Sequence, residues 1–183
     1  TGSTADNSIV IWAAGATSNK VFKFTTADNG ATFTPAEITL TGSATQGSAA
    51  ACPNTAATEF FVNSNGTYVK RYQANGTLVD SIPGSIIGTG SNAMRYFEAG
   101  GKKYLSVFAY GSGNENVRTV DITAGLSGAV LVGASSSLGS VANGNGTGDV
   151  GLKVNGDNTV NVYVISTTNG MGAYRLDPAN SGT

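Results

Sequence analysis

Residues 60–82 read FFVNSNGTYVKRYQANGTLVDSI. Two Asn-Gly pairs, which begin at Asn65 and Asn75, separate three short runs rich in β-branched and aromatic residues. Asn-Gly tolerates two successive positive φ angles, so it is the strongest short-range signal for a β-hairpin. This stretch therefore predicts three antiparallel strands joined by two tight turns.

The same arrangement returns along the chain. An apolar run that is followed by small polar residues and Gly occurs at 9–15, 60–66, 104–111 and 162–170. A second run, with a cation beside hydrophobic residues, follows each of them. The cations are Lys23, Lys70, Arg118 and Arg175, spaced by 47, 48 and 57 residues. Strand alternation predicts each cation opposite its apolar neighbours, with its head in water.

Internal repeats of about 40 to 50 residues with antiparallel strands are typical of a β-propeller. We predict an all-β repeat domain over residues 1–183, with blade-like units at about 8–40, 48–83, 92–133 and 148–176. The expected strand counts are 3, 4, 4 and 3, because the first unit lacks an inner strand and the last an outer one. A propeller blade has four strands, so the count predicts part of a larger propeller. A β-sandwich is the alternative, since short strands and frequent turns suit it equally well.

The composition excludes several classes of protein. Only 11% of the residues are charged and 40% are hydrophobic, with 26 Gly. Lys plus Arg is 10 and Asp plus Glu is 11, so we expect no nucleic-acid partner. No apolar run approaches the roughly 18 residues of a membrane span. Such a charge-poor, Gly-rich composition favours a secreted or cell-surface protein.

Residue types that carry common catalysis are scarce. The chain has no His and one Cys, Cys52, so the usual general base, a typical zinc site and an intramolecular disulfide are excluded. We expect Cys52 to be a small buried hydrophobic residue. A glycosidase would need two carboxylates about 5 to 9.5 Å apart. Only Glu59, Glu98 and Asp149 lie in or next to predicted strands, and we predict that the protein is not an enzyme.

Residues 143–149 read NGNGTGD, in which oxygen-bearing side chains alternate with Gly as in a calcium loop. The candidate ligands are Asn143, Asn145, Thr147 and Asp149. The first position holds Asn in place of Asp, and the twelfth holds Val154 where a bidentate Glu belongs. With one carboxylate we expect poor affinity, so a Gly-rich connection that enters a strand is the favoured interpretation. We expect no other cofactor.

The motifs GTYVKRY at 66–72 with NGTL at 75–78, RYFE at 95–98 with GKKYL at 101–105, and NGNGTGDV at 143–150 carry a resemblance. Over roughly residues 57 to 175 the chain resembles an uncharacterised family of secreted, propeller-like proteins from Bacteroidota and related bacteria. The resemblance implies a propeller-like fold and export. It implies no catalytic or binding residue, because the shared motifs are turns and strands.

Two functions follow as expectations. The first is a non-enzymatic secreted or cell-surface binding or scaffold module, whose loop faces bind a protein or a glycan. The second is a structural subunit of an extracellular layer or filament that self-associates through open edge strands. A carbohydrate-active enzyme is a third, weaker alternative. Four aromatic residues are candidates for stacking on sugars, namely Trp12, Tyr104, Tyr110 and Tyr163. Three of the four fall inside the most apolar strands, so packing in the core is the favoured interpretation.

Overall fold

The computed structural model describes residues 2–3, 8–14, 19–42, 51–64, 68–87, 93–109, 114–134, 139–140, 148–166 and 169–180. In this part of the chain the strands form four antiparallel sheets that follow one another in chain order. The only helix of the described residues is the four-residue α1 (Gly84–Ile87). None of the described helices is long and apolar enough to cross a membrane.

Sheets 1, 2 and 4 are meanders, in which every strand pairs with the next one along the chain, and the first four strands of sheet 3 form another. Sheet 1 contains β1 (Gly2–Ser3), β2 (Ser8–Ala14), β3 (Lys20–Thr26) and β4 (Thr34–Thr39). Sheet 2 contains β5 (Ala51–Pro53), β6 (Glu59–Ser64), β7 (Tyr68–Gln73) and β8 (Leu78–Pro83). Sheet 3 contains β9 (Ala93–Ala99), β10 (Lys102–Ala109), β11 (Asn114–Asp121) and β12 (Val130–Ala134), and β13 (Gly139–Ser140) also pairs with β11. Sheet 4 contains β14 (Gly148–Val154), β15 (Val160–Ser166) and β16 (Gly170–Leu176).

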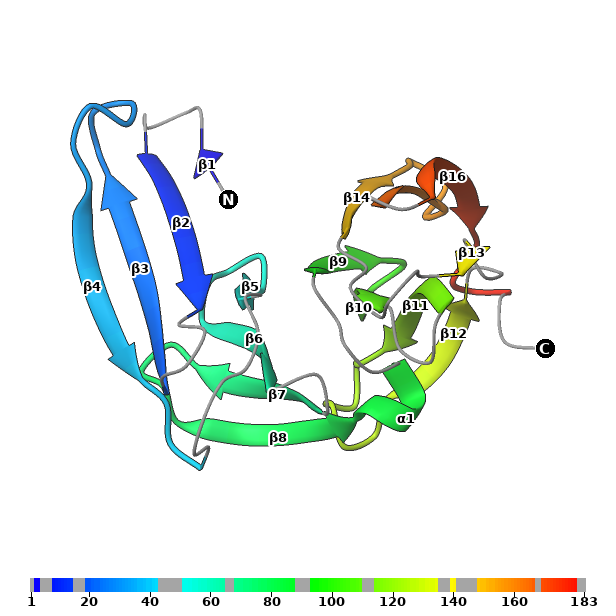
Figure 1. Ribbon diagram of the computed structural model, residues 1–183, viewed down its shortest axis with the longest axis horizontal. Coiled ribbons are helices and arrows are strands. Elements are labelled where there is room, and N and C mark those ends of the chain that lie inside the picture. The colour runs from blue at the N-terminus through cyan, green and yellow to red at the C-terminus, as the bar shows by residue number, and fades with distance from the viewer. Residues whose placement is uncertain are drawn as a thin grey trace.

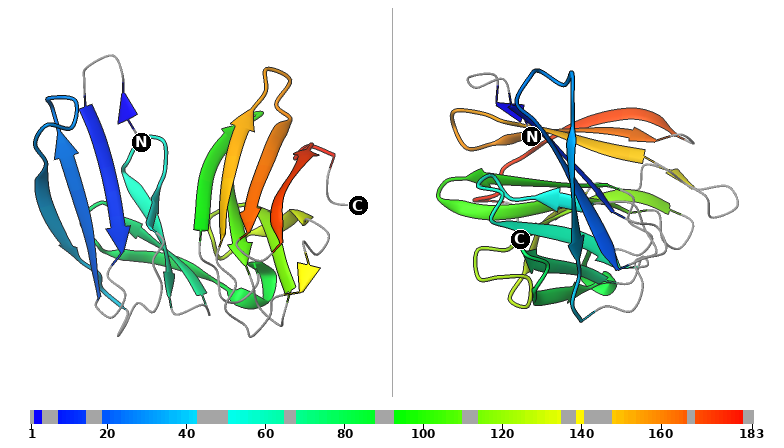
Figure 2. Two further views of the ribbon diagram at one scale, coloured as in Figure 1. Left: turned by 45° about the horizontal axis from the view of Figure 1, so that its top comes forward. Right: turned by 90° about the vertical axis from the view of Figure 1, so that its left-hand side faces the viewer.

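The four sheets lie along an open arc, with sheet 1 at one end and sheet 4 at the other (Figure 1). The left view of Figure 2 shows the same separation between the two end sheets. Contacts between sheets run through β2 and β5, then β5 and β9, then β9 and β14, which are strands near the inside of the arc. This side-by-side order of meanders is the propeller-like architecture that the repeat predicts.

Three separate hydrophobic clusters hold the arc together, one between each pair of consecutive sheets. The first joins Val21 of sheet 1 to Phe60 of sheet 2. The second joins Phe61 of sheet 2 to Leu105 of sheet 3. The third joins Tyr104 of sheet 3 to residues of sheet 4 such as Val162. A β-sandwich has a single core between two sheets, so this distribution favours the propeller-like arrangement.

Consecutive residues of the central strands therefore serve different cores. In β6, Phe60 and Val62 pack toward sheet 1 while Phe61 packs toward sheet 3. In β10, Leu105 packs toward sheet 2, whereas Tyr104 and its neighbours on the other face pack toward sheet 4. Side chains alternate between the faces of a strand, so an uninterrupted apolar run is the pattern of a strand that is buried on both sides.

The predicted all-β repeat is confirmed, and two details of the strand count are wrong. The first sheet has an inner strand, because β1 pairs Gly2 with Ile9 and Ser3 with Ser8. Small polar residues are poor strand formers. These two residues nevertheless form a strand, because their backbone groups pair with those of β2. Sheet 3 also gains β13, which lies beside β11. Sheet 4 has three strands among the described residues, as predicted.

The repeated cations do not share one environment. Lys23 lies over the ring of Trp12 at 5.5 Å from its centroid. The Lys70 ammonium donates to the carbonyl oxygen of Gly42 at 3.3 Å. Arg118 donates to the carbonyl oxygen of Ile86 in α1, and Arg175 lies on the uncovered face of sheet 4. The expectation that each cation reaches water is correct for Arg175, whose side chain is 61% exposed, and wrong for Arg118, because the face of β11 that carries Arg118 packs on sheet 2.

Candidate functional site

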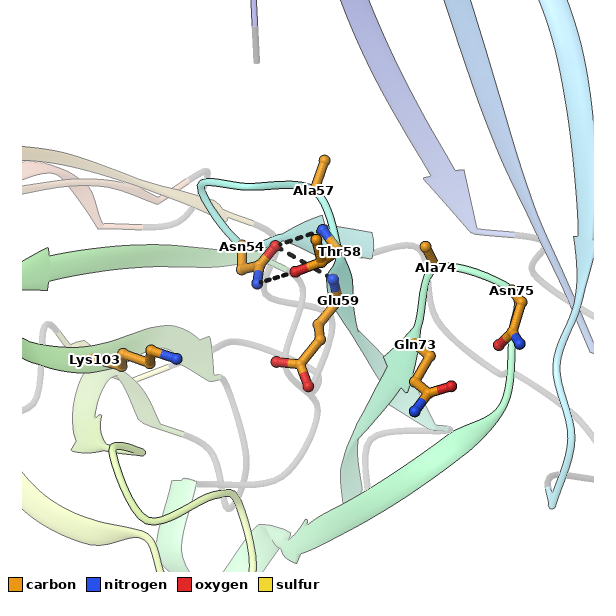
Figure 3. Close-up of a pocket in the computed structure, with 8 residues that line it drawn as sticks. All are labelled: Asn54, Ala57, Thr58, Glu59, Gln73, Ala74, Asn75 and Lys103. Carbon is orange, nitrogen blue, oxygen red and sulfur yellow. Dashed lines mark hydrogen bonds between the residues drawn. The ribbon is translucent and has the colours of Figure 1, made fainter.

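A pocket of about 700 Å³, lined mostly by polar residues, lies between sheets 2 and 3. Three turn regions at one end of the sheets build it: the β5–β6 turn, the β7–β8 turn and the β9–β10 hairpin. Its lining residues are Asn54, Ala57, Thr58, Glu59, Gln73, Ala74, Asn75 and Lys103. Figure 3 shows Glu59 between Lys103 on one side and Gln73 on the other.

The β5–β6 turn is fixed by the side chain of Asn54. Its Oδ1 atom accepts hydrogen bonds from the backbone N–H groups of Thr58 at 3.0 Å and Glu59 at 3.3 Å. Its Nδ2 atom donates to the hydroxyl of Thr58 at 3.1 Å, and Figure 3 shows this network. Ala57 adopts a positive φ of 53° inside the turn. The amide of Asn54 is therefore committed to the turn, and it positions Glu59 at the start of β6.

The β7–β8 turn forms the second wall. The backbone N–H of Ala74 donates to the carbonyl oxygen of Thr58 at 2.9 Å, which ties this turn to the first one. Asn75 Oδ1 accepts from the backbone N–H of Thr77 at 3.0 Å, as an Asx turn does. The side-chain amide of Gln73 is exposed and makes no hydrogen bond to the described residues. Gln73 thus offers both a donor and an acceptor to the pocket.

An ion cluster lies beside the pocket. Arg71 holds Asp80 in a two-pronged contact, with Nε to Oδ1 at 2.9 Å and Nη2 to Oδ2 at 2.8 Å. The same guanidinium lies 3.5 Å from Glu59 Oε2. Burial opposes the charge of Arg71, but the hydrogen bonds and charges of Asp80 and Glu59 outweigh it and raise the pKa of the guanidinium. Asp80 Oδ2 also accepts from the N–H of Leu126 at 2.9 Å, which connects sheet 2 to sheet 3.

Lys103 supplies the third wall from the neighbouring sheet. Its backbone is held by two hydrogen bonds: its N–H donates to the Thr123 hydroxyl at 3.0 Å, and its carbonyl accepts from Ile122 N–H at 2.8 Å. Its ammonium makes no ion pair with the described residues. Lys102, the next residue back, faces the other side of β10 and binds Asp121 at 3.1 Å. Only one of the two adjacent lysines therefore keeps its cation free for a ligand.

The chemistry of this pocket is recognition by hydrogen bonds. Gln73 and Asn75 contribute amides, Glu59 a carboxylate and Lys103 an ammonium. Glu59 and Asp80 both contact the Arg71 guanidinium. The described residues include no group of three His, Cys, Asp or Glu side chains that could hold a metal ion. The arrangement is suited to holding a polar ligand.

The predicted calcium loop falls largely outside the described residues. Asn143, Asn145 and Thr147 belong to the part of the chain that is not described, so this prediction stands as it was. Asp149 is described, in β14. Its Oδ2 accepts from Arg95 Nη2 at 2.8 Å, and its Oδ1 accepts from the N–H of Val150 at 2.8 Å. Its carboxylate is therefore already engaged by other groups of this chain.

Cys52 is buried in the cluster between sheets 2 and 3, as the sequence predicts. Burial raises the pKa of the Cys52 thiol to about 11, partly offset by the hydrogen bond from the N–H of Tyr96. The thiolate that a nucleophile requires is thus disfavoured at neutral pH. A smaller pocket of about 430 Å³ lies near Cys52 between β2, β5 and β9. Its guanidinium, from Arg95, is engaged by Asp149, so it offers fewer free groups than the first pocket.

The remaining candidates from the sequence have separate roles. Glu98 accepts a hydrogen bond from the Tyr96 hydroxyl at 2.6 Å. Burial, this hydrogen bond and the charges of Glu98 and Glu59 raise the pKa of Tyr96, so the two carboxylates act on the same hydroxyl, whereas Asp149 is paired with Arg95. Trp12 and Tyr104 pack in cores as expected. Tyr163 does not, because it lies on the uncovered face of sheet 4 and is 44% exposed. Tyr110 lies outside the described residues.

Sequence reasoning found Glu59 as a strand carboxylate but missed Gln73 and Lys103. Both residues lie beside turns. The sequence could have indicated them through the positions of those turns, which lie at the same end of the sheets. Antiparallel meanders place the first and third turns of each unit at the same end, so these turns were candidates for a common surface. The contact between two units could not be inferred from the repeat alone.

The fold and the pocket define a class: an open array of propeller-type sheets with a polar pocket between two of them. No protein-family profile and no curated protein matches the chain. A DUF4623 family protein from Bacteroides eggerthii matches in structure with a TM-score of 0.71 and 11% identity, over 96% of this chain and 44% of that one. DUF denotes a domain of unknown function, so an uncharacterised Bacteroides protein shares the fold.

Two further solved structures are similar at lower scores. BBS1N, solved in complex with ARL6DN, matches with a TM-score of 0.55 and 19% identity, over 96% of this chain and 48% of that one. The NanB sialidase from Streptococcus pneumoniae matches with a TM-score of 0.53 and 9% identity, over 100% of this chain and 30% of that one. The chain thus spans less than half the length of each neighbour. At these identities the likeness shows the fold alone.

Proposed function

We propose that this protein is a non-enzymatic binding module, secreted or displayed on the cell surface, that binds a glycan in the pocket between sheets 2 and 3. One observation carries the proposal: Glu59, Gln73 and Lys103 present a carboxylate, an amide and an ammonium to one pocket, on a frame of hydrogen-bonded turns. The charge-poor composition supports the location.

The chemistry of the lining favours a glycan over a peptide. Sugar hydroxyls both donate and accept hydrogen bonds, which matches amide and carboxylate partners. Peptide ligands gain most of their binding energy from apolar or aromatic anchors in desolvated pockets. Among the residues that the structure describes, Ala57 and Ala74 are the only apolar ones that line this pocket. A peptide side chain would find no anchor there.

The absence of His from the chain, together with the contact between Glu59 and the Arg71 guanidinium, supports binding without turnover. A carbohydrate-active enzyme is the competing hypothesis, because one of the structural neighbours is a sialidase. That similarity is at 9% identity, so it carries no residue of the sialidase to this chain.

Calorimetric titration with soluble hexasaccharides of glucose, xylose and mannose tests the proposal. We expect at least one of them to bind, Lys103→Ala and Gln73→Ala to weaken that binding about tenfold each, and Lys102→Ala to leave it unchanged. Lys102 is the matched control because it lies in the same hairpin on the opposite face. Chromatography of the same mixtures after incubation should show intact sugars. Cleavage products that disappear in Glu59→Gln would establish an enzyme instead.

A further inference from the structure

Each end sheet of the arc has one apolar face that nothing in the described structure covers. The sheet 1 end face consists of Ile11, Ala13, Phe22 and Phe24, which the register of β2 and β3 places together. Ile11 is 47% exposed, and the rings of Phe22 and Phe24 stack with centroids 6.5 Å apart. These residues face away from the cluster that joins sheet 1 to sheet 2.

The sheet 4 end face is its counterpart at the other end of the arc. It consists of Tyr163, Ile165, Met171 and Ala173, and the register pairs Ile165 with Met171. Ile165 is 55% exposed and Met171 is 78% exposed. The alternate residues of the same strand, Val160, Val162 and Val164, are buried against sheet 3. Figure 1 shows these two sheets at the ends of the arc.

Two strands of the end sheets, β2 and β15, have the sequence pattern of the central strands, whereas β14 reads GDVGLKV and alternates. β15 reads VNVYVIS, and β2 reads SIVIWAA, so both contain apolar residues at consecutive positions. In β6 and β10 the same pattern accompanies burial on both faces. A strand that faces water on one side would alternate apolar and polar residues instead. The end faces therefore have the character of interfaces between sheets.

The interior interfaces also show which faces match. Each sheet has one face toward the preceding sheet in chain order and one face toward the following sheet. At each interior interface, the following-side face of one sheet packs on the preceding-side face of the next sheet. The sheet 4 end face is a following-side face, and the sheet 1 end face is a preceding-side face. We propose that the sheet 4 end face of one copy packs on the sheet 1 end face of a second copy, in a pair with two equivalent contacts that closes the arc.

The size of the faces decides how such a pair behaves. A face of three seven-residue strands, as in sheet 4, measures about 14 by 23 Å, or roughly 330 Å². One contact then buries roughly 660 Å² in total, the size of a crystal contact, whereas two bury roughly 1,300 Å², which lies in the range of stable interfaces. Both contacts must form together, so damage to either face should separate the pair.

Two of the charges near the faces are paired, whereas Lys153, which the register places beside Asn161 at one end of the sheet 4 face, makes no ion pair with the described residues. Glu37 on the sheet 1 side is paired with Lys20 at 2.7 Å, and Asp157 beside the sheet 4 face is paired with Arg175 at 2.6 Å. Partial burial costs less desolvation free energy for an ion pair that is already formed than for a lone charge. This association uses sheet faces, and so it differs from the edge-strand pairing that the strand count suggests.

Light scattering after size-exclusion chromatography tests the pair, on the full chain at about 100 µM. We expect the mass of two chains for the unmodified protein and of one chain for Ile11→Lys and for Ile165→Lys, with unchanged circular dichroism. Val130→Lys is the matched control, because Val130 is an exposed apolar residue, at 61%, in the outer strand β12 and outside both end faces. It should remain paired.

The two face variants also test the direction of packing. Head-to-tail contacts require both faces, so each substitution alone must lower the mass. A monomeric unmodified chain, or a pair that survives both substitutions, overturns the proposal. A pair that is lost with only one of the two substitutions shows self-packing of that face, and it overturns the proposal as well.

Discussion

Arg71 is the residue through which two sheets and the candidate site meet. It binds Asp80 with two hydrogen bonds and approaches Glu59, while Asp80 also accepts from Leu126 of the neighbouring sheet. The side chains of Arg71 and Asp80 are 20% and 14% exposed, so this pair is screened less than a surface pair. The cluster fixes the carboxylate of the pocket and joins sheets 2 and 3 at the same point.

Asp80→Ala tests that cluster. The substitution leaves Arg71 and the N–H of Leu126 without their main acceptor, and we expect it to lower the free energy of unfolding by about 2 to 3 kcal/mol. Lys102→Ala, which breaks the more exposed pair with Asp121, should lower the free energy of unfolding by a clearly smaller amount. Urea denaturation measures both. Equal losses would mean that the Arg71 cluster is no more than an ordinary surface contact.

Asp28 gives the fold a dependence on acid pH. Hydrogen bonds from the hydroxyl of Thr26 and from the hydroxyl and N–H of Thr32 hold the pKa of Asp28 well below its ordinary value of 3.8. A carboxyl group with a lower pKa in the folded state binds fewer protons there than in the unfolded state. Its stabilisation is therefore complete above about pH 4 to 5 and is lost as the pH falls further.

The matching variant is Asp28→Asn, which keeps the shape of the side chain and removes its titration. We expect the unmodified protein to unfold at higher urea than the variant near neutral pH, and the difference to shrink as the pH falls below about 4. Urea midpoints at a series of pH values measure it. A difference that stays constant down to pH 2.5 would show that the charge of Asp28 contributes nothing.

At the scale of the elements, single turn positions are more restricted in residue type than strand positions. The turn between β11 and β12 contains Gly125 at a φ of +93°. A Cβ atom on this residue would lie 2.8 Å from Asp80 Oδ2 and 3.2 Å from Arg71 Nη2. Glycine is thus required twice, for its backbone conformation and for the space that the ion cluster occupies.

Gly125→Ala and Gly101→Ala separate these two requirements. Gly101 also has a positive φ, +76°, but a Cβ there would meet nothing within 4 Å. We expect Gly101→Ala to cost about 1 kcal/mol from backbone strain alone, and Gly125→Ala about 2 to 3 kcal/mol because the cluster must also move. Thermal or urea unfolding gives the two values. Similar losses would indicate that the cluster shifts without cost.

The sequence predicts the strands far better than the site. Runs such as the one from Phe60 to Val62 are apolar on both faces, and Asn-Gly turns mark their ends, so local patterns are sufficient to place them. The pocket depends on Lys103 from one sheet meeting Gln73 from another. That meeting is set by how adjacent sheets rotate and pack, which no local period encodes. The two-residue β1 was missed for a related reason, because its pairing rests on β2 and not on its own residues.

At the scale of the whole molecule, the arc is a linear array. Sheets 2 and 3 have a hydrophobic cluster on both sides, whereas sheets 1 and 4 have one cluster each. In such arrays stability is close to a sum over units and their interfaces, so units with one interface open more readily than units with two. The end sheets are consequently the sensitive parts of the fold.

Hydrogen exchange should reveal this gradient along the chain. At a concentration where light scattering shows a monomer, we expect amides of β6, β7, β10 and β11 to exchange slowest, and those of β2, β3, β15 and β16 at least about tenfold faster. Leu176→Ala, which removes a buried side chain from the cluster between sheets 3 and 4, should speed exchange in sheet 4 and leave sheet 2 close to unchanged. Mass spectrometry of peptic fragments resolves the four sheets. Uniform protection, or an effect of Leu176→Ala that spreads equally to sheet 2, would mean that the chain unfolds as one cooperative unit.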